Sequence, residues 1–190
     1  MRPLTLILVF LPLIVFSVLA RLLPAGLIGV AALAAAATVL MTAPATRPIW
    51  PPKALPASCL TLFALIAVLG FGLGRGGDSW LATWGGAGIG LAVGLVILAL
   101  VPVRPFTERF AREATPRAYW SSPTFRRVNR VLSLGWGGAI FAVGLSRVTA
   151  AAISQHTSRR APELLLGLIA PVVIILGALT FSHGCYRSIQ

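Results

Sequence analysis

The chain of 190 residues is 57% hydrophobic and only 11% charged, with a mean hydropathy of +0.91. Soluble domains carry charge on about a quarter of their residues, so this composition excludes an ordinary soluble protein and indicates a membrane protein. The net charge of +12 does not indicate nucleic-acid binding, because the basic residues lie between apolar runs and not on a basic folded face. We therefore predict an all-α, polytopic protein that forms a single membrane domain over residues 1–190.

Six apolar segments are long enough to cross a bilayer, which takes about 20 helical residues. The predicted transmembrane helices are 3–20, 23–43, 55–74, 80–103, 131–153 and 162–181. Between the third and fourth lies GRGGDSW, residues 74–80, which we interpret as a glycine-rich turn. It lacks the Lys-Ser/Thr of a phosphate-binding loop.

The first segment also resembles a signal peptide, with a basic start at Arg2 and a VLA sequence at 18–20 that is similar to a small-residue cleavage site. The second apolar run begins almost at once, so we interpret the first two segments as a tight hairpin turning near Arg21, Pro24 and Gly26. Removal of the first segment would leave five spans, with the termini on opposite sides of the membrane.

Basic residues are distributed unevenly between the two sides of the six-span topology. One side receives Arg2, Arg47, Lys53, Arg187 and the seven arginines of residues 104–130; the other receives Arg21, Arg75, Arg147, Arg159 and Arg160. Cytoplasmic loops carry the excess of Lys and Arg, so we predict that both termini and the 104–130 loop are cytoplasmic. Trp50 and Trp120 then lie near the cytoplasmic boundary and Trp80 near the opposite one, as expected of interfacial anchors.

The loop begins with a short predicted helix, FTERFAREA, residues 106–114. Thr107 is placed to cap it, and Glu108–Arg112 and Arg109–Glu113 are i,i+4 ion pairs. Phe106 and Phe110 fall on one face, which favours an amphipathic helix lying on the membrane surface. Pro116 ends this helix.

A second predicted helix starts at Ser122 and Pro123, a capping residue followed by a first-turn proline, and runs directly into the fifth span. The arginines of the loop either orient the protein and contact headgroups or form a docking site for an anionic lipid or an acidic partner. The candidates for that contact are Arg109, Arg112, Arg117, Arg126, Arg127 and Arg130.

The residues from Arg104 to Gly138, with RPFTERFARE, Pro116 and YWSSPTFRRVNRVLSLGWG, resemble uncharacterised bacterial multi-pass inner-membrane proteins of the intracellular septation protein A group. This resemblance covers about 35 residues, since the remainder of the chain is similar only in being apolar. It implies a bacterial inner-membrane protein with an envelope or assembly role, and it carries over no catalytic residue.

Gly86, Gly90 and Gly94 lie four residues apart on the fourth span and therefore line one helix face. Small residues in lipid allow close helix approach. The stripe is either packed within one bundle or exposed as a seam for a homo-oligomer or another membrane protein.

Catalytic chemistry is not indicated by the sequence. The acids lie outside the spans or at their ends, and no metal-ligand spacing or Ser/His/Asp arrangement is present. Ser133, Ser146 and Thr149 are expected to bond to their own helix. We predict no catalytic residue, metal or cofactor, and consider Arg147 either a snorkelling side chain or a polar site.

These features favour a non-enzymatic accessory or scaffold protein, in contact with the bilayer, anionic headgroups and a membrane-protein partner or second copy. The alternative is a small transporter or channel, supported by Arg147, by helix bends at Pro12 and Pro171, and by a weak internal repeat in which the second and fourth spans both exit into Arg-Pro. A third possibility, an enzyme that acts on lipids, is not supported by any group of polar residues in the sequence.

Overall fold

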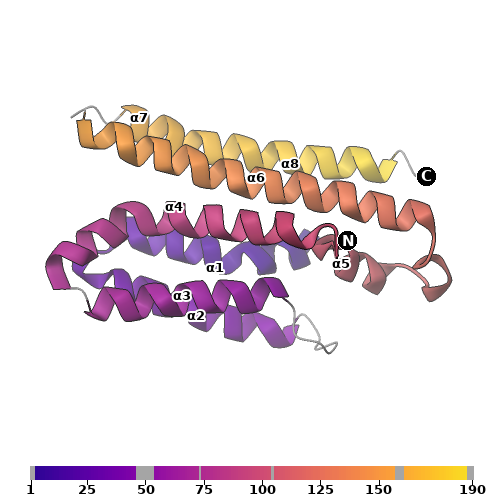
Figure 1. Ribbon diagram of the computed structural model, residues 1–190, viewed down its shortest axis with the longest axis horizontal. Coiled ribbons are helices and arrows are strands. Elements are labelled where there is room, and N and C mark those ends of the chain that lie inside the picture. The colour runs from indigo at the N-terminus through magenta and orange to yellow at the C-terminus, as the bar shows by residue number, and fades with distance from the viewer. Residues whose placement is uncertain (1–2, 46–53, 73, 104, 157–160, 188–190) are drawn as a thin grey trace. The chain divides into compact units, whose positions relative to one another are not determined.

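The structure is a computed structural model that describes residues 3–45, 54–72, 74–103, 105–156 and 161–187. Every regular element in these ranges is a helix, which confirms the predicted all-α class (Figure 1). Contacts divide the chain into two compact units, one over residues 2–89 and one over residues 90–190. Each unit is described by itself, and the single membrane domain stays a prediction.

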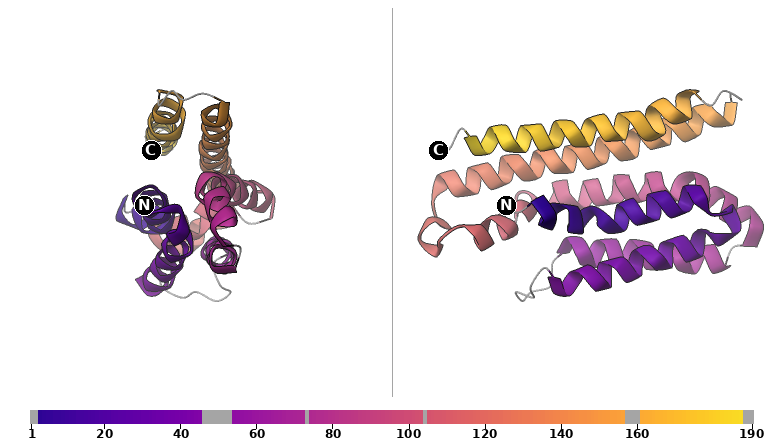
Figure 2. Two further views of the ribbon diagram at one scale, coloured as in Figure 1. Left: turned by 90° about the vertical axis from the view of Figure 1, so that its left-hand side faces the viewer. Right: turned by 180° about the vertical axis from the view of Figure 1, so that it is seen from behind.

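The first unit holds α1 (Pro3–Leu22), the 3-10 turn η1 (Ala25–Leu27), α2 (Ile28–Ala45), α3 (Ala54–Gly72) and the start of α4 (Gly74–Leu100). α2 packs against both α1 and α3 (Figure 2). Gly70 permits the α2–α3 contact, because a Cβ there would lie 2.8 Å from the Gly29 backbone nitrogen. The close passage of α1 into α2 through η1 confirms the predicted hairpin.

The GRGGDSW segment is helical, so its prediction as a turn was wrong. α4 begins at Gly74, whose φ of +66° only glycine adopts without strain. This left-handed residue lies at the first position of the new helix. As a result Asp78 lies within α4 and is only 7% exposed, with no hydrogen-bond partner for its Oδ1 among the described residues.

The second unit holds the remainder of α4, α5 (Phe106–Ala114), the 3-10 turn η2 (Arg117–Tyr119), α6 (Pro123–His156), α7 (Ala161–Leu164), the π-helical turn η3 (Leu165–Ile169) and α8 (Ala170–Arg187). α6 and α8 run side by side (Figures 1 and 2). The predicted passage of the second loop helix into the fifth span is confirmed, because α6 is one helix of 34 residues.

The π-helical turn has a local cause in Pro171. Proline has no N–H to offer the carbonyl of Gly167 four residues earlier, and its ring crowds that carbonyl. The widened turn over Leu165–Ile169 lies directly before this point. Prolines and π-turns both produce helix kinks. The bend expected at Pro171 stays a prediction.

Two glycines of the predicted stripe pack inside the second unit. A Cβ on Gly90 would lie 3.0 Å from Gly144 Cα, and one on Gly94 would lie 2.6 Å from the Phe141 backbone nitrogen. These positions of α4 are therefore filled by α6, and they do not form an exposed seam. Gly86 lies on the same helix in the first unit and is half-buried.

Four segments of the described chain are helical, long and apolar enough to cross a membrane: Ala25–Thr42, Gly77–Leu100, Pro123–His156 and Leu165–Cys185. The first and third predicted spans correspond to α1 and α3, where the apolar helical stretches found are the shorter Leu11–Leu22 and Ala57–Gly72. The structure thus supports a membrane protein with four candidate spanning helices, and the count of six stays a prediction.

Candidate functional site

The α5 helix is held against α6 by buried hydroxyl groups. Thr107 Oγ1 donates to the Asn129 carbonyl oxygen at 2.8 Å and lies 2.8 Å from Ser133 Oγ, which also accepts the Thr107 backbone N–H at 3.2 Å. All three residues are at most 2% exposed. Each hydrogen bond to a buried group of this kind contributes about 1 kcal/mol, so the three fix the position of α5 on α6.

This arrangement corrects two sequence predictions. Thr107 does not cap α5, which begins after Pro105 without a side-chain cap, because its hydroxyl is used by α6. Ser133 bonds to Thr107 across the helix pair, whereas we had expected a bond to its own helix. Ser146 and Thr149 do bond to their own helix, at the carbonyls of Val143 and Leu145.

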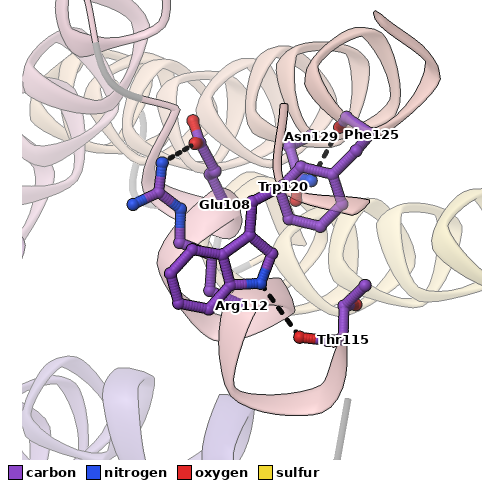
Figure 3. Close-up of polar contacts among 6 residues, drawn as sticks. All are labelled: Glu108, Arg112, Thr115, Trp120, Phe125 and Asn129. Atoms are coloured by element: carbon purple, nitrogen blue, oxygen red, sulfur yellow. Dashed lines mark hydrogen bonds and ion pairs between the residues drawn. The ribbon is translucent and has the colours of Figure 1, made fainter. Parts of the chain in front are cut away.

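Asn129 adds a polar group beneath the same junction. Its Nδ2 donates to the Phe125 carbonyl at 2.8 Å, as Figure 3 shows. Its Oδ1 is buried and has no hydrogen-bond partner in the described part of the chain. A buried acceptor without a donor costs about 1–3 kcal/mol, which makes this junction less stable than its three hydroxyl bonds alone imply.

Two arginines converge on Trp120. The guanidinium carbons of Arg112 and Arg117 lie 5.0 Å and 5.7 Å from the centre of its ring, within cation–π range. The indole Nε1 donates to the Thr115 carbonyl at 2.9 Å, which fixes the ring across the end of α5 (Figure 3). Arg112 also pairs with Glu108 at 2.5 Å, the i,i+4 pair expected from the sequence.

The α6 helix starts as predicted. The Phe125 backbone N–H donates to Ser122 Oγ at 3.1 Å, so Ser122 caps the helix and Pro123 is its first residue. The first turn of α6 contains no acidic residue. Arg126, Arg127 and Arg130 follow on the first two turns, and all three are exposed. We call residues 105–130 the cationic segment.

The remaining predicted residues are spread over the chain. Trp80 is 60% exposed on α4, in keeping with an interfacial anchor, while Trp120 is half-buried. Trp50 lies outside the described residues. Arg109 lies on α5, and its side chain is outside the described part. Arg147 is half-buried on α6.

The sequence analysis missed the polar residues that join helices. Trp136 is 3% exposed on α6, and its Nε1 donates to Ser182 Oγ on α8 at 3.0 Å. Asn129, Ser133 and Trp136 are spaced by four and three residues and therefore share one helix face. A polar group repeated along an otherwise apolar face was the available signal, because such a group needs a partner from another helix.

The described residues do not assemble a recognisable catalytic centre. Within them no group of three His, Cys, Asp or Glu side chains is placed to hold a metal ion. No protein family, characterised protein or solved structure matches the chain. The cationic segment is therefore the candidate site, and its chemistry is the binding of anionic groups by exposed guanidinium side chains.

Proposed function

We propose that this protein is a non-enzymatic accessory or scaffold protein of the bacterial inner membrane, and a subunit of a larger membrane complex. In this proposal the chain crosses the membrane six times, with both termini and the cationic segment in the cytoplasm. The proposal agrees with the resemblance of residues 104–138 to the septation protein A group. Its docking surface is the cationic segment.

The observation that carries the proposal is the exposure of the arginines on a fixed scaffold. Five of them have described side chains, all exposed: Arg112, Arg117, Arg126, Arg127 and Arg130. Among the described residues of this segment, one ion pair is formed, between Arg112 and Glu108. The exposed charges face outward, and the α5–α6 hydrogen bonds fix the backbone of α5 on α6, so that binding has to order the arginine side chains and not the two helices.

Co-purification tests the proposal. Wild-type protein is extracted from native membranes in mild detergent, alongside a variant with these five arginines replaced by Gln. A scaffold retains a stoichiometric partner that the variant loses. The control replaces Arg2, Arg47, Lys53, Arg75 and Arg160 by Gln, which removes the same charge elsewhere. The proposal is contradicted if the wild-type protein is extracted from the membrane without any partner.

A small transporter or channel is the second candidate, favoured by the π-helical turn before Pro171 in a candidate spanning segment, since such turns are frequent at functional sites. Purified protein in liposomes would then move an ion or small solute, and Arg147→Ala would abolish the flux. If solute moves and the movement requires Arg147, the transporter proposal holds and the scaffold proposal fails.

The proposed topology has its own test. Reporter tags inserted near Tyr119 and at the C-terminus should both report a cytoplasmic location. Tyr119 is 61% exposed in the η2 turn, so an insertion there leaves the helices intact. A periplasmic signal at either site contradicts the six-span arrangement.

A further inference from the structure

The length of α6 places three arginines at a definite depth. The helix has 34 residues and is therefore about 51 Å long at about 1.5 Å per residue. The hydrocarbon core is about 30 Å thick, so about 20 Å of α6 extends beyond it. The part of α6 without a charged residue begins at Val131, directly after Arg130, and continues to Ser146. Arg126, Arg127 and Arg130 consequently lie within about two turns of the hydrocarbon edge, at the depth of lipid headgroups.

The charge pattern of this helix end favours an external anion. Positive side chains in the first turns of a helix oppose its dipole, and the first turn of α6 has no acid to offset them. The spacing from Arg130 to Arg127 and Arg126 is three and four residues, so the three side chains lie on neighbouring positions of one exposed surface. Arg112, by contrast, is already paired with Glu108.

We infer that Arg126, Arg127 and Arg130 bind the phosphates of anionic phospholipid headgroups in the cytoplasmic leaflet. Guanidinium groups hold phosphate through two parallel hydrogen bonds, and every anionic headgroup offers such a phosphate at the depth that these side chains reach. The exposed Tyr119 and the half-buried Trp120 precede them as aromatic interfacial anchors. This inference rests on the proposed function and names the first partner of the cationic segment.

Native mass spectrometry of the full-length protein in detergent tests the lipid binding. The probes are phosphatidylglycerol and phosphatidylcholine of equal chain length, because they share the phosphate and differ in net charge. One basic residue near an anionic lipid surface contributes about fivefold to binding. Three together then give about a 100-fold preference for phosphatidylglycerol, which Arg126→Gln, Arg127→Gln and Arg130→Gln combined should remove.

The control variant replaces Arg75, Arg159 and Arg160 by Gln, which removes the same charge, and it should keep the wild-type preference. A wild-type protein without preference, or a triple variant that keeps it, overturns the inference. Circular dichroism and thermal unfolding should be unchanged in the triple variant, since the three side chains are exposed.

Partner co-purification separates this inference from the proposed function. If the triple variant loses the lipid preference and still retains the partner, the lipid inference holds and the partner docks elsewhere. If it keeps the lipid preference and loses the partner, these arginines bind an acidic protein and the lipid inference fails. If wild-type protein shows the lipid preference without any partner, the lipid inference holds and the scaffold proposal fails.

Discussion

The α6 helix is packed in two different ways along its length. Near its N-terminal end it holds α5 through hydrogen bonds among Thr107, Asn129 and Ser133. Farther along it holds α4 through Gly144, whose position leaves no room for a side chain against Gly90 and Leu91. One contact is made by polar groups and the other by the absence of side chains.

The difference follows from the solvent expected around each contact. In lipid, apolar side chains gain little by leaving hydrocarbon, so helices associate by close backbone packing. Near the membrane–water boundary, where water and headgroups are present, buried hydrogen bonds from hydroxyl groups fix the position of a short helix. α5 has nine residues, too few to be stable alone, so it depends on these bonds. The substitutions below separate the two kinds of contact.

Gly144→Ala should give the largest effect. Its Cβ would lie 2.5 Å from the Leu91 backbone nitrogen and 2.8 Å from the Gly90 carbonyl carbon, so α4 and α6 must move apart. Overpacking of this kind costs about 1–3 kcal/mol and more where backbone must shift. Thermal unfolding in detergent, followed by intrinsic tryptophan fluorescence, measures the loss.

Gly138→Ala is the matched control on the same helix, because a Cβ there has no atom within 4 Å. Alanine is the better helix former by about 0.5–1 kcal/mol, so this variant should be unchanged or more stable. Equal destabilisation by the two substitutions would mean that Gly144 does not lie in a close helix contact.

The glycine contact shows what sequence could and could not predict. Spacing of four residues placed Gly90 and Gly94 on one face, and lipid packing gave the reason for small residues there. Sequence did not identify the partner, because Gly144 and Phe141 are separated from them by about 50 residues and nothing in the spacing of the α6 glycines shows that Gly137 and Gly144 are the ones that face α4. The helical class and cap of α6 were predictable because Ser122, Pro123 and the apolar run act locally.

The polar junction was missed for the same physical reason. A threonine at the start of a short helix fits a local cap, and sequence offered no sign that a residue 22 positions away would take its hydroxyl. The turn predicted at GRGGDSW failed differently, since three glycines in seven residues disfavour a helix by propensity alone. The surrounding packing of α4 overrides that preference, as the burial of Asp78 indicates.

Thr107→Val should give the next largest effect, because it keeps the shape and removes the hydroxyl that bonds to Asn129 and Ser133. A lost buried hydrogen-bond partner costs about 1–3 kcal/mol. The loss of stability should be confined to α5. Hydrogen exchange at residues 106–114 should therefore become faster, while the melting temperature of the whole protein changes little.

Thr149→Val provides the comparison within α6. Its hydroxyl is exposed and bonds only within its own helix, so stability should change by less than about 0.5 kcal/mol. Faster exchange over 106–114 in this control as well would show that the α5 position does not depend on Thr107.

Ser182→Ala should have a smaller effect. It removes the oxygen that accepts the Trp136 indole N–H at 3.0 Å, a single neutral bond between α6 and α8. Such a bond contributes about 1 kcal/mol. The melting temperature and the near-UV circular dichroism of the tryptophans should both change. Ser146→Ala, which removes a bond within one helix, is the control and should leave both unchanged.

Ser122→Ala should give the smallest global effect, because it acts only on the end of α6. The cap satisfies the Phe125 backbone N–H, and its loss costs about 1 kcal/mol at the first turn. Hydrogen exchange at residues 124–126 should accelerate while the melting temperature remains nearly constant. The neighbouring Ser121 is exposed, and Ser121→Ala should leave this exchange unchanged. A local change without a global one would show that the polar end of α6 frays independently of its glycine-packed part, as expected if lipid contacts and not the cap hold that end in the membrane-bound protein.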